Sequence, residues 1–395
     1  MQTERYDLVV VGAGPAGSST AKTAAEQGLD VLLIERNAEI GVPVRCAEGV
    51  SKEIEQFVEI DQRWVCTAPR GMILYGPDGT AIVLSVADGT ELGYVVDRRL
   101  FDKALAQQAA HAGAEVRVKT RASGLIRADG GVNGVYATTT GEPVRICADV
   151  VVGADGVESQ IGRWAGLDTC LPLSEIAICA QYLMCNITVN TAFYETYFGS
   201  AIAPKGYAWI FPKGPDSANI GLGISGDMSG ESRRARDYLD VFVSTRFPEG
   251  TILAKSYGAV PLSGPVYETV ANGLLLVGDA ARHVNPANGG GILQALQGGA
   301  IAGEVIANAI RARDVSKRGL QGYEKRWRRE FGKVLTAGLR LKQVLTRLDD
   351  PALTQFFHSL GGEIMVKEYS ERACMKELLI RKNPRVLVSL LRLLF

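Results

Sequence analysis

The N-terminal part of the chain alternates between short apolar runs and a glycine-rich turn. The run LVVV at 8–11 contains no polar residue, which is typical of a parallel strand buried on both faces. Glycines follow it, then a stretch of small residues that ends near Gly28, and a second apolar run starts at Val31. This order predicts a strand over 7–11, a helix that ends at Gly28, and a strand over 31–35.

Two later segments repeat the pattern of a buried strand that ends in a turn of small residues. They are VVVGADG at 150–156 and LLLVGDAAR at 274–282, and the second leads to a glycine-rich helix start at 289–291. Before them, the pattern predicts a helix over 98–112 and a hairpin with its tip at 129–134.

The pattern changes between 171 and 264, where polar and apolar residues alternate and aromatic residues are frequent. Such alternation predicts antiparallel strands. From 320 onward the pattern is helical and rich in Lys and Arg. We therefore predict an α/β fold with a discontinuous Rossmann-type nucleotide-binding domain, an inserted antiparallel-sheet substrate domain and a C-terminal helical region. The predicted ranges are 1–60, 96–170 and 265–325 for the first, 61–95 and 171–264 for the second, and 326–395 for the third.

Composition and charge narrow the class of protein. The 43 Lys and Arg residues balance 43 Asp and Glu residues, so no net field favours nucleic acid as a partner. The seven cysteines are scattered without CxxC spacing, which predicts no metal site, no disulfide framework and a reducing, cytoplasmic location. We expect no signal peptide and no membrane-spanning segment, since no apolar run approaches the roughly 20 residues that cross a bilayer. Peripheral contact with the inner membrane surface stays open.

The sequence GAGPAG at 12–17 has the Gly-x-Gly-x-x-Gly spacing of a dinucleotide-binding turn. The first glycine permits the sharp turn out of the strand, the second lets the backbone approach a pyrophosphate, and the third lets the helix pack on the strand. The start of the helix directs free N–H groups at the phosphates. The predicted cofactor contacts in this turn are Gly12, Gly14, Pro15, Ala16 and Gly17.

Glu35 completes the fingerprint about 20 residues after the turn, at the end of the next strand, where a carboxylate accepts hydrogen bonds from a ribose diol. An acid at this position favours an unphosphorylated ribose. The cofactor is therefore FAD or NAD rather than NADP.

Three later segments favour FAD. Arg98 begins a helix, where its guanidinium could pair with a phosphate or with the flavin side of the cofactor, although a solvated arginine is as common there. Asp155 lies in the turn after a buried strand, and Asp279 follows another, where its carboxylate could accept from a ribityl hydroxyl. The helix start after it directs N–H groups at the carbonyl edge of a flavin. The predicted contacts in that helix start are Gly289, Gly290, Gly291 and Ile292.

Four segments resemble, in type and order, the FAD-binding segments of para-hydroxybenzoate hydroxylase and its relatives. They are the glycine turn at 12–17, the helix that begins at Arg98, the turn at 150–156 and the segment 274–292. The segments PVRCAEGV at 43–50 and YAWIFPKG at 207–214 closely resemble the geranylgeranyl reductase family, and the resemblance covers nearly the whole chain. It implies an FAD-dependent enzyme that saturates the isoprenoid C=C bonds of geranylgeranyl chains in archaeal ether phospholipids. It also implies FAD contacts from Ala16, Glu35, Arg45, Cys46, Ala47, Gly49, Arg98, Ala122, Asp279, Gly291 and Ile292.

Tyr207, Trp209 and Phe211 alternate along a predicted strand, so their rings project to one face. On the residues alone, a sheet that packs its core face is the favoured explanation of this stripe, and a ligand wall is the alternative. The family resemblance associates it with the cavity that holds the lipid chain. Lys213, at the end of the strand, is either a contact to a head-group phosphate or a solvated side chain.

The chemistry requires hydride transfer from reduced flavin to one alkene carbon and a proton for the other. No acid–base pair stands out in the sequence. Cys46 is the candidate catalytic residue, which would gate a proton or tune the flavin. The alternative interpretation is that Cys46 is a small residue that only packs against its neighbours. His283, beside the GDAA turn, is interpreted as structural.

The sequence has no second glycine fingerprint between a strand and a helix, so no dedicated nicotinamide domain is expected. The electron donor is then a small ferredoxin-like iron–sulfur protein or a transiently bound NAD(P)H. The segment RKNPRVLVSLLRLLF at 381–395 is either a docking helix or an anchor in the membrane interface. Two other functions are alternatives. An aromatic or polyketide monooxygenase shares the FAD motifs, and a non-catalytic prenyl-lipid-binding module has a related fold, although the intact FAD motifs weigh against it.

Overall fold

The computed structural model describes residues 1–86, 89–230 and 233–366. The chain divides into two compact units, and both are discontinuous in sequence. The first unit comprises Met1–Val44, Arg98–Leu171 and Pro261–Thr336. The second comprises Arg45–Asp97, Pro172–Val260 and the described residues from Ala337 onward. The α/β fold predicted from the sequence is confirmed.

The first unit is built on a sheet whose central strands run parallel in the order β18-β11-β1-β2-β8. The short β17 joins β18 antiparallel, and the hairpin β9–β10 pairs with β11. The strands are β1 (Gln2–Val11), β2 (Val31–Ile34), β8 (Glu115–Arg117), β9 (Thr120–Ala128), β10 (Gly131–Thr139), β11 (Glu142–Gly153), β17 (Val270–Ala271) and β18 (Leu274–Leu276).

Helices and a hairpin cover opposite faces of this sheet. Leu8 and Val10 of β1 pack in one core with the helices α1, α2 and α5, whereas Val9 and Val11 pack in another with the β9–β10 hairpin. Because both faces are covered, the strand reads as an unbroken apolar run in the sequence. The helices of the unit are α1 (Pro15–Glu26), α2 (Arg98–His111), α3 (Gln160–Ala165), α5 (Ile292–Arg311), α6 (Lys317–Leu320) and α7 (Gly322–Trp327).

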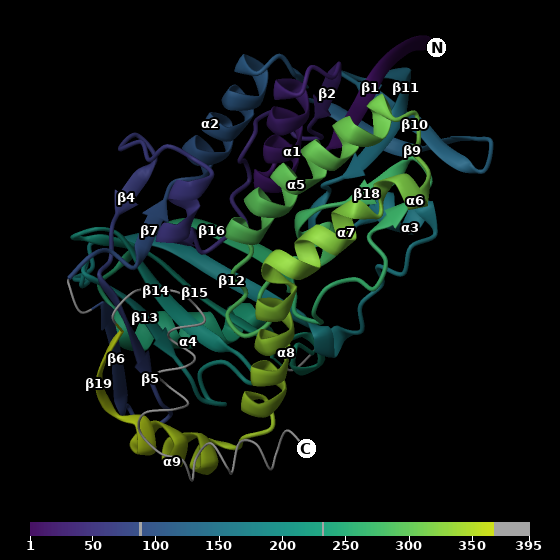
Figure 1. The fold of residues 1–395 in the computed structure, drawn as a ribbon. Coiled ribbons are helices and arrows are strands. Elements are labelled where there is room, and N and C mark those ends of the chain that lie inside the picture. Colours follow the sequence, from purple (N-terminus) through teal and green to yellow (C-terminus); the bar gives the residue numbers. More distant parts are fainter. Residues whose placement is uncertain (87–88, 231–232, 367–395) are drawn as a thin grey trace. The chain divides into compact units, whose positions relative to one another are not determined.

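Helices α1 and α5 lie side by side (Figure 1), and glycines of α5 contact backbone atoms of α1. A Cβ atom on Gly299 would lie 2.5 Å from the carbonyl oxygen of Ala16, and one on Gly303 would lie 2.7 Å from the Cβ of Thr23. The Ser19 hydroxyl also donates a hydrogen bond of 2.7 Å across the contact to the carbonyl of Leu296. The two glycines, one helical turn apart, therefore set the spacing of the two helices.

The second unit contains an eight-stranded sheet in the order β16-β12-β15-β14-β13-β5-β6-β19 and a three-stranded sheet in the order β3-β7-β4. The antiparallel pairing of β12, β15, β14 and β13 agrees with the alternation seen in the sequence. Its strands are β3 (Gly49–Ser51), β4 (Val65–Thr67), β5 (Gly71–Tyr75), β6 (Ala81–Val86), β7 (Gly93–Val96), β12 (Ile176–Cys185), β13 (Phe193–Tyr197), β14 (Tyr207–Gly214), β15 (Ser217–Ser225), β16 (Thr251–Pro261) and β19 (Gly362–Val366). Helix α4 (Ala235–Arg246) packs on one face of the larger sheet.

The C-terminal region is helical in α8 (Lys333–Leu345) and α9 (Asp350–Leu360), as predicted, but one part of that prediction is wrong. Residues 362–366 form the strand β19, which runs parallel to β6. The buried Ile364 joins Ile82 and Leu84 of β6 and Phe357 of α9 in one apolar cluster, so tertiary packing overrides the local helical pattern. The basic, apolar segment at 381–395 lies outside the described residues.

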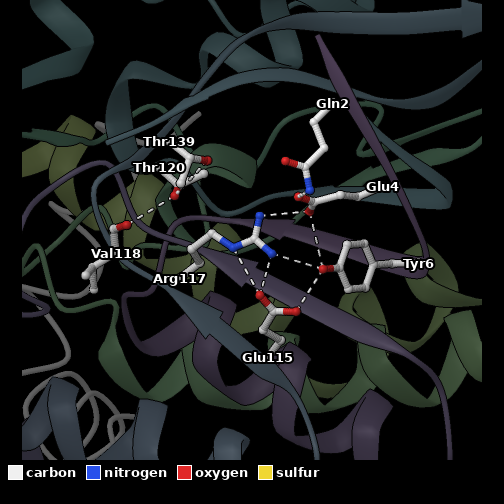
Figure 2. Close-up of polar contacts among 8 residues, drawn as sticks. All are labelled: Gln2, Glu4, Tyr6, Glu115, Arg117, Val118, Thr120 and Thr139. Carbon is white, nitrogen blue, oxygen red and sulfur yellow. Dashed lines mark hydrogen bonds and ion pairs between the residues drawn. The ribbon is translucent and has the colours of Figure 1, made fainter. Parts of the chain in front are cut away.

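A polar cluster ties the start of β1 to β8 (Figure 2). The Arg117 guanidinium donates to Glu4 at 2.8 Å, to the Tyr6 hydroxyl at 3.1 Å and to Glu115 at 3.0 Å. Burial, together with the Glu115 carboxylate, raises the pKa of Tyr6 to about 12, so the phenol stays protonated and donates to Glu115 at 2.8 Å.

We expect Arg117→Met to lower the free energy of unfolding by about 1–2 kcal/mol, because the half-buried Glu4 carboxylate and Tyr6 hydroxyl lose the charged group that donates to both. Urea denaturation followed by circular dichroism measures the change. Arg5→Met is the matched control, since Arg5 is 72% exposed in its pair with Asp149, and it should cost less than about 0.5 kcal/mol. Equal losses in the two variants would contradict the prediction.

Candidate cofactor and substrate sites

The glycine turn between β1 and α1 leaves open space at the start of the helix. Gly12 has a φ of +108°, and a Cβ there would lie 2.3 Å from the carbonyl oxygen of Ala154. A Cβ on Gly17 would lie 1.8 Å from the carbonyl oxygen of Gly12. Around Gly14, by contrast, no atom lies within 4 Å of the Cβ position. Pro15 is the first residue of α1. The N–H groups in the first turn of an α-helix have no acceptor within the helix, so those of α1 can donate to a pyrophosphate.

Glu35 lies directly beside this turn. One oxygen of its carboxylate accepts the N–H of Ala13 at 3.1 Å, and the other accepts the N–H of Asn37 at 2.9 Å. The carbonyl of Glu35 accepts the N–H of Thr120 at 2.8 Å, which brings the start of β9, and Ala122 within it, to the same edge of the sheet. The glycine turn, the Glu35 carboxylate and the start of β9 thus lie together at one edge of the sheet, as the sequence predicts for a dinucleotide-binding turn.

We expect Glu35→Ala to weaken FAD binding about tenfold, because the ribose loses a charged acceptor that contributes about 1–2 kcal/mol. Titration of the deflavinated protein with FAD, followed by quenching of flavin fluorescence, measures the dissociation constant. Glu39→Ala makes the same charge change on an exposed side chain of the following loop, which pairs with Lys103, and should leave affinity unchanged. If both variants bind FAD as the parent does, Glu35 has no part in the site.

The first unit also brings together the residues predicted for the flavin side. Asp279 lies in the short 3-10 turn η5 (Gly278–Ala281) after β18, and a Cβ on Gly291 would lie 3.5 Å from its carboxylate. Burial raises the pKa of Asp279, and the Arg98 guanidinium opposes that rise. Gly291 is the residue that caps α5, so the N–H groups of Ile292 and its successors start beside the Asp279 carboxylate.

Two predicted cofactor residues have partners within the protein. Arg98 binds both carboxylate oxygens of Asp102, at 2.6 Å each, one helical turn further along α2. Asp155 accepts the N–H of Ile161 at 2.9 Å and thereby holds the start of α3. Burial raises the pKa of Asp155. Contacts within the protein therefore orient both side chains.

The predicted helix start at 288–292 is a tight loop. Asn285 donates its N–H to the carbonyl of Gly290 at 2.8 Å, and the N–H of Gly289 donates to the carbonyl of Asn285 at 2.8 Å. Asn288 accepts the N–H of Gly290 at 2.9 Å. These bonds fix the loop that leads into α5.

In the second unit, the three predicted aromatic residues share one face of β14. The ring centroids of Tyr207 and Trp209 are 6.0 Å apart, and those of Trp209 and Phe211 are 6.4 Å apart. The intervening Ala208 and Ile210 point to the opposite face, in the core beneath α4. The alternation therefore separates a packed core from an aromatic face, as the pattern predicts.

Two glycines, Gly221 of the neighbouring strand β15 and Gly49 of β3, lie in contact with the aromatic rings. A Cβ on Gly221 would lie 2.5 Å from the Trp209 ring, and one on Gly49 would lie 2.7 Å from the Phe211 ring. The segment 45–49 thus packs against the aromatic face, with Cys46 half-buried and Arg45 exposed. The sulfur of Cys46 accepts the N–H of Glu48 at 3.2 Å.

Lys213 is neither solvated nor free. Its ammonium group donates to Glu48 at 2.7 Å and to the carbonyl of Val96 at 2.8 Å, and the side chains of Lys213 and Glu48 are 11% and 5% exposed. The sequence analysis did not predict this buried pair. It also missed Asn219, which donates to the Glu48 carboxylate, Gln181, which donates to the carbonyl of Cys46, and Asp102, which pairs with Arg98. The spacing of four between Arg98 and Asp102 was a readable signal, as were polar residues at inward positions of apolar strands.

The described part of the chain contains no group of three or more His, Cys, Asp or Glu residues arranged to hold a metal ion. Within the same residues, no helix has the length and apolarity needed to span a membrane. His283 is fully buried in the first unit among the rings of Tyr323, Trp327 and Phe331.

Comparison with known proteins gives two matching family models. Residues 5–181 match an FAD-binding domain, and residues 175–260 match a geranylgeranyl reductase catalytic domain. The chain therefore carries an FAD-binding domain.

Individual relatives extend the similarity over the whole chain. A digeranylgeranylglycerophospholipid reductase of Methanothrix thermoacetophila is 49% identical over 98% of both chains. A geranylgeranyl bacteriochlorophyll reductase-like protein from Thermoplasma acidophilum, solved as a crystal structure, has a TM-score of 0.94 and 38% identity and covers 99% of this chain and 100% of its own. A flavin-dependent brominase with a TM-score of 0.71 and 17% identity, covering 96% of this chain and 100% of its own, shares the fold alone.

Proposed function

We propose, because the chain belongs to the digeranylgeranylglycerophospholipid reductase family of geranylgeranyl reductases, that it uses FAD to saturate the C=C bonds of geranylgeranyl chains in an archaeal ether phospholipid. The observation that carries the proposal is the pairing of two features in one chain. One is the nucleotide site of the first unit, and the other is the aromatic face of β14, which lies within the matched catalytic domain.

The proposal assigns a task to each part of the chain. Residues 1–60, 96–170 and 265–325 bind FAD, residues 61–95 and 171–264 bind the substrate, and residues 326–395 form the helical region. When bound, FAD supplies the hydride. Within the FAD-binding part, the start of α1 binds the pyrophosphate, Glu35 binds the ribose, and Asp279 with the start of α5 orients the flavin end.

The aromatic face suits a hydrocarbon chain better than a polar substrate. Tyr207, Trp209 and Phe211 offer adjacent ring surfaces, and burial of an isoprenoid chain against them excludes water from the alkene. Burial raises the pKa of Tyr207 well above its ordinary value and that of Cys179 to about 12. Both groups stay neutral, which keeps this face compatible with an apolar ligand.

The half-buried Cys46 is the candidate catalytic residue at this face. Its thiol would gate the proton that the second alkene carbon receives, or tune the flavin. Cys46→Ala with unchanged FAD content should then lower the rate of prenyl reduction, and an unchanged rate would remove Cys46 from the mechanism.

Anaerobic incubation of the FAD-loaded protein with dithionite and a digeranylgeranylglyceryl phospholipid tests the function. The expected product gains about two mass units for each reduced bond, the stoichiometry of a hydride plus a proton, as measured by mass spectrometry. Oxygen-dependent consumption of NADPH with a hydroxylated aromatic product would indicate a monooxygenase instead. A purified protein that takes up no FAD would indicate a non-catalytic binding module.

The electron donor and the membrane contact are separate parts of the proposal. We expect electrons to come from a ferredoxin-like protein or from NAD(P)H, and the rates at which each bleaches the bound flavin without oxygen distinguish the two. We expect the protein to work in the cytoplasm, in peripheral contact with the membrane that holds its substrate. Flotation of the full chain with liposomes of archaeal ether lipid measures this contact.

A further inference from the structure

The segment that carries Cys46 has an unusual backbone for its sequence. Glu48 adopts a φ of +72°, in the left-handed region that costs a non-glycine residue about 1 kcal/mol or more. Its side chain is nevertheless 5% exposed. A charged residue in this conformation stays there only if its surroundings hold it.

Side chains from adjacent strands hold successive residues of this segment. Gln181 of β12 donates to the carbonyl of Cys46 at 2.9 Å. Asn219 of β15 donates to the carbonyl of Ala47 at 3.2 Å and to the carboxylate of Glu48 at 2.6 Å. The segment is thus tied to the sheet at positions 46, 47 and 48 in turn.

A third strand completes the attachment. Lys213 of β14 donates to the same oxygen of the Glu48 carboxylate and to the carbonyl of Val96 in β7. Since β12, β15 and β14 are neighbours in the sheet, the three polar side chains form a row across an otherwise apolar and aromatic face. Buried polar groups on such a face are costly unless every one has a partner.

Gln181 also reaches the aromatic residues. Its side-chain oxygen accepts the indole N–H of Trp209 at 3.0 Å, while its nitrogen donates to Cys46. Gln181 is 6% exposed and Trp209 is 7% exposed. One amide therefore links the orientation of the indole to the position of the Cys46 backbone.

We propose that Gln181 and Asn219 are positioning residues that hold segment 45–49, and with it the Cys46 thiol, in a single conformation against the aromatic face. This rests on the proposed function in one respect only, namely that the positioned thiol and indole face a prenyl chain. The attachment itself is a property of the second unit.

Alkylation of Cys46 by iodoacetamide in the FAD-loaded full chain tests the proposal, with modification of each cysteine followed by peptide mass spectrometry. In Gln181→Met and Asn219→Leu the freed segment should expose the thiol, and its alkylation rate should rise about tenfold. The exposed Cys170 is the internal reference and should react at an unchanged rate.

Gln181→Glu separates positioning of the segment from support of Trp209 alone. A carboxylate still accepts the indole N–H but cannot donate to the Cys46 carbonyl, so Cys46 should again react faster than in the parent. Thr196→Val is the matched control. Thr196 is a buried residue of the neighbouring strand β13, and its hydroxyl has no hydrogen-bond partner within residues 1–86, 89–230 and 233–366. Its replacement should leave the Cys46 rate unchanged.

Parental Cys46 rates in Gln181→Met and Asn219→Leu, with thermal unfolding and FAD content unchanged, would overturn the proposal. A parental rate in Gln181→Glu alone would overturn the role of Gln181 toward the segment. The readout needs no substrate, so it stands even if the parent fails to reduce a prenyl lipid. Where it does reduce one, the faster-alkylating variants should also show a lower kcat.

Discussion

Replacement of Gly299 by valine is expected to weaken the binding of FAD so far that the purified protein is colourless. The Cβ position of Gly299 lies 2.5 Å from the carbonyl oxygen of Ala16 and 2.8 Å from the Cβ of Ser19. Both atoms belong to or lie next to the backbone of α1, so neither can move aside like the end of a flexible side chain. Helices α1 and α5 must then separate.

Separation affects both ends of the proposed cofactor site, because each helix begins at one of them. α1 starts at the glycine turn for the pyrophosphate, and α5 starts at Gly291 beside Asp279. An overpacked contact of this kind costs about 1–3 kcal/mol. A displacement of about 1 Å at two helix starts removes much of their contribution to binding. We expect FAD affinity to fall at least about 30-fold, and the purified variant to be colourless.

Flavin absorbance of the purified protein and the dissociation constant for added FAD measure the effect. Gly299→Ala should give an intermediate loss. Gly322→Ala is the matched control, since its Cβ would lie 3.8 Å from Val305 in ordinary contact, and it should bind FAD as the parent does. A yellow Gly299→Val protein with parental affinity would show that the spacing of the helices does not determine the site.

The sequence predicted those features whose causes are local. The glycine turn, the buried strand before it and the acid at Glu35 each follow from a few neighbouring residues, and the structure brings them together. The aromatic face of β14 could likewise be read from strict alternation. In each case the spacing along the chain fixes the geometry.

Features that depend on distant partners were not predictable from single positions. The sequence predicts Lys213 either as a contact to a head-group phosphate or as a solvated side chain. In the structure it forms a buried ion pair with Glu48, 165 residues away in the chain. The local pattern predicts a helix for residues 362–366, but in the structure they pair with β6 and form the strand β19. Gly299 and Gly303 looked like ordinary helix residues, because the need for glycine arises only from the approach of α1.

His283 gives the second large expected effect, on stability as a function of pH. Its side chain is fully buried, with ring centroids 4.6 Å from Trp327 and 5.0 Å from Phe331. Among the residues that the structure describes, neither ring nitrogen has a hydrogen-bond partner. Burial, with a smaller contribution from the Arg328 guanidinium, lowers the pKa of His283 to about 3. The imidazole is therefore neutral in the folded protein throughout the physiological range.

The sign of the pH dependence follows from the two pKa values. In the unfolded chain a histidine titrates near its ordinary pKa of about 6.5, so between about pH 6.5 and pH 3 the unfolded state binds one proton more than the folded state. The free energy of unfolding then falls as the pH falls, by about 1.4 kcal/mol per pH unit. Between pH 7 and pH 5 this single group should remove about 2 kcal/mol.

His283→Phe tests this, because a phenyl ring keeps the aromatic packing and has no proton to bind. Urea denaturation at pH 7 and pH 5 should show that the variant loses about 2 kcal/mol less than the parent over this interval. His111→Phe, at an exposed position at the end of α2, controls for the loss of a histidine and should keep the parental pH dependence. If His283→Phe and the parent lose the same free energy between pH 7 and pH 5, the buried imidazole must be protonated in the folded protein, and its aromatic surroundings must open to admit water at low pH.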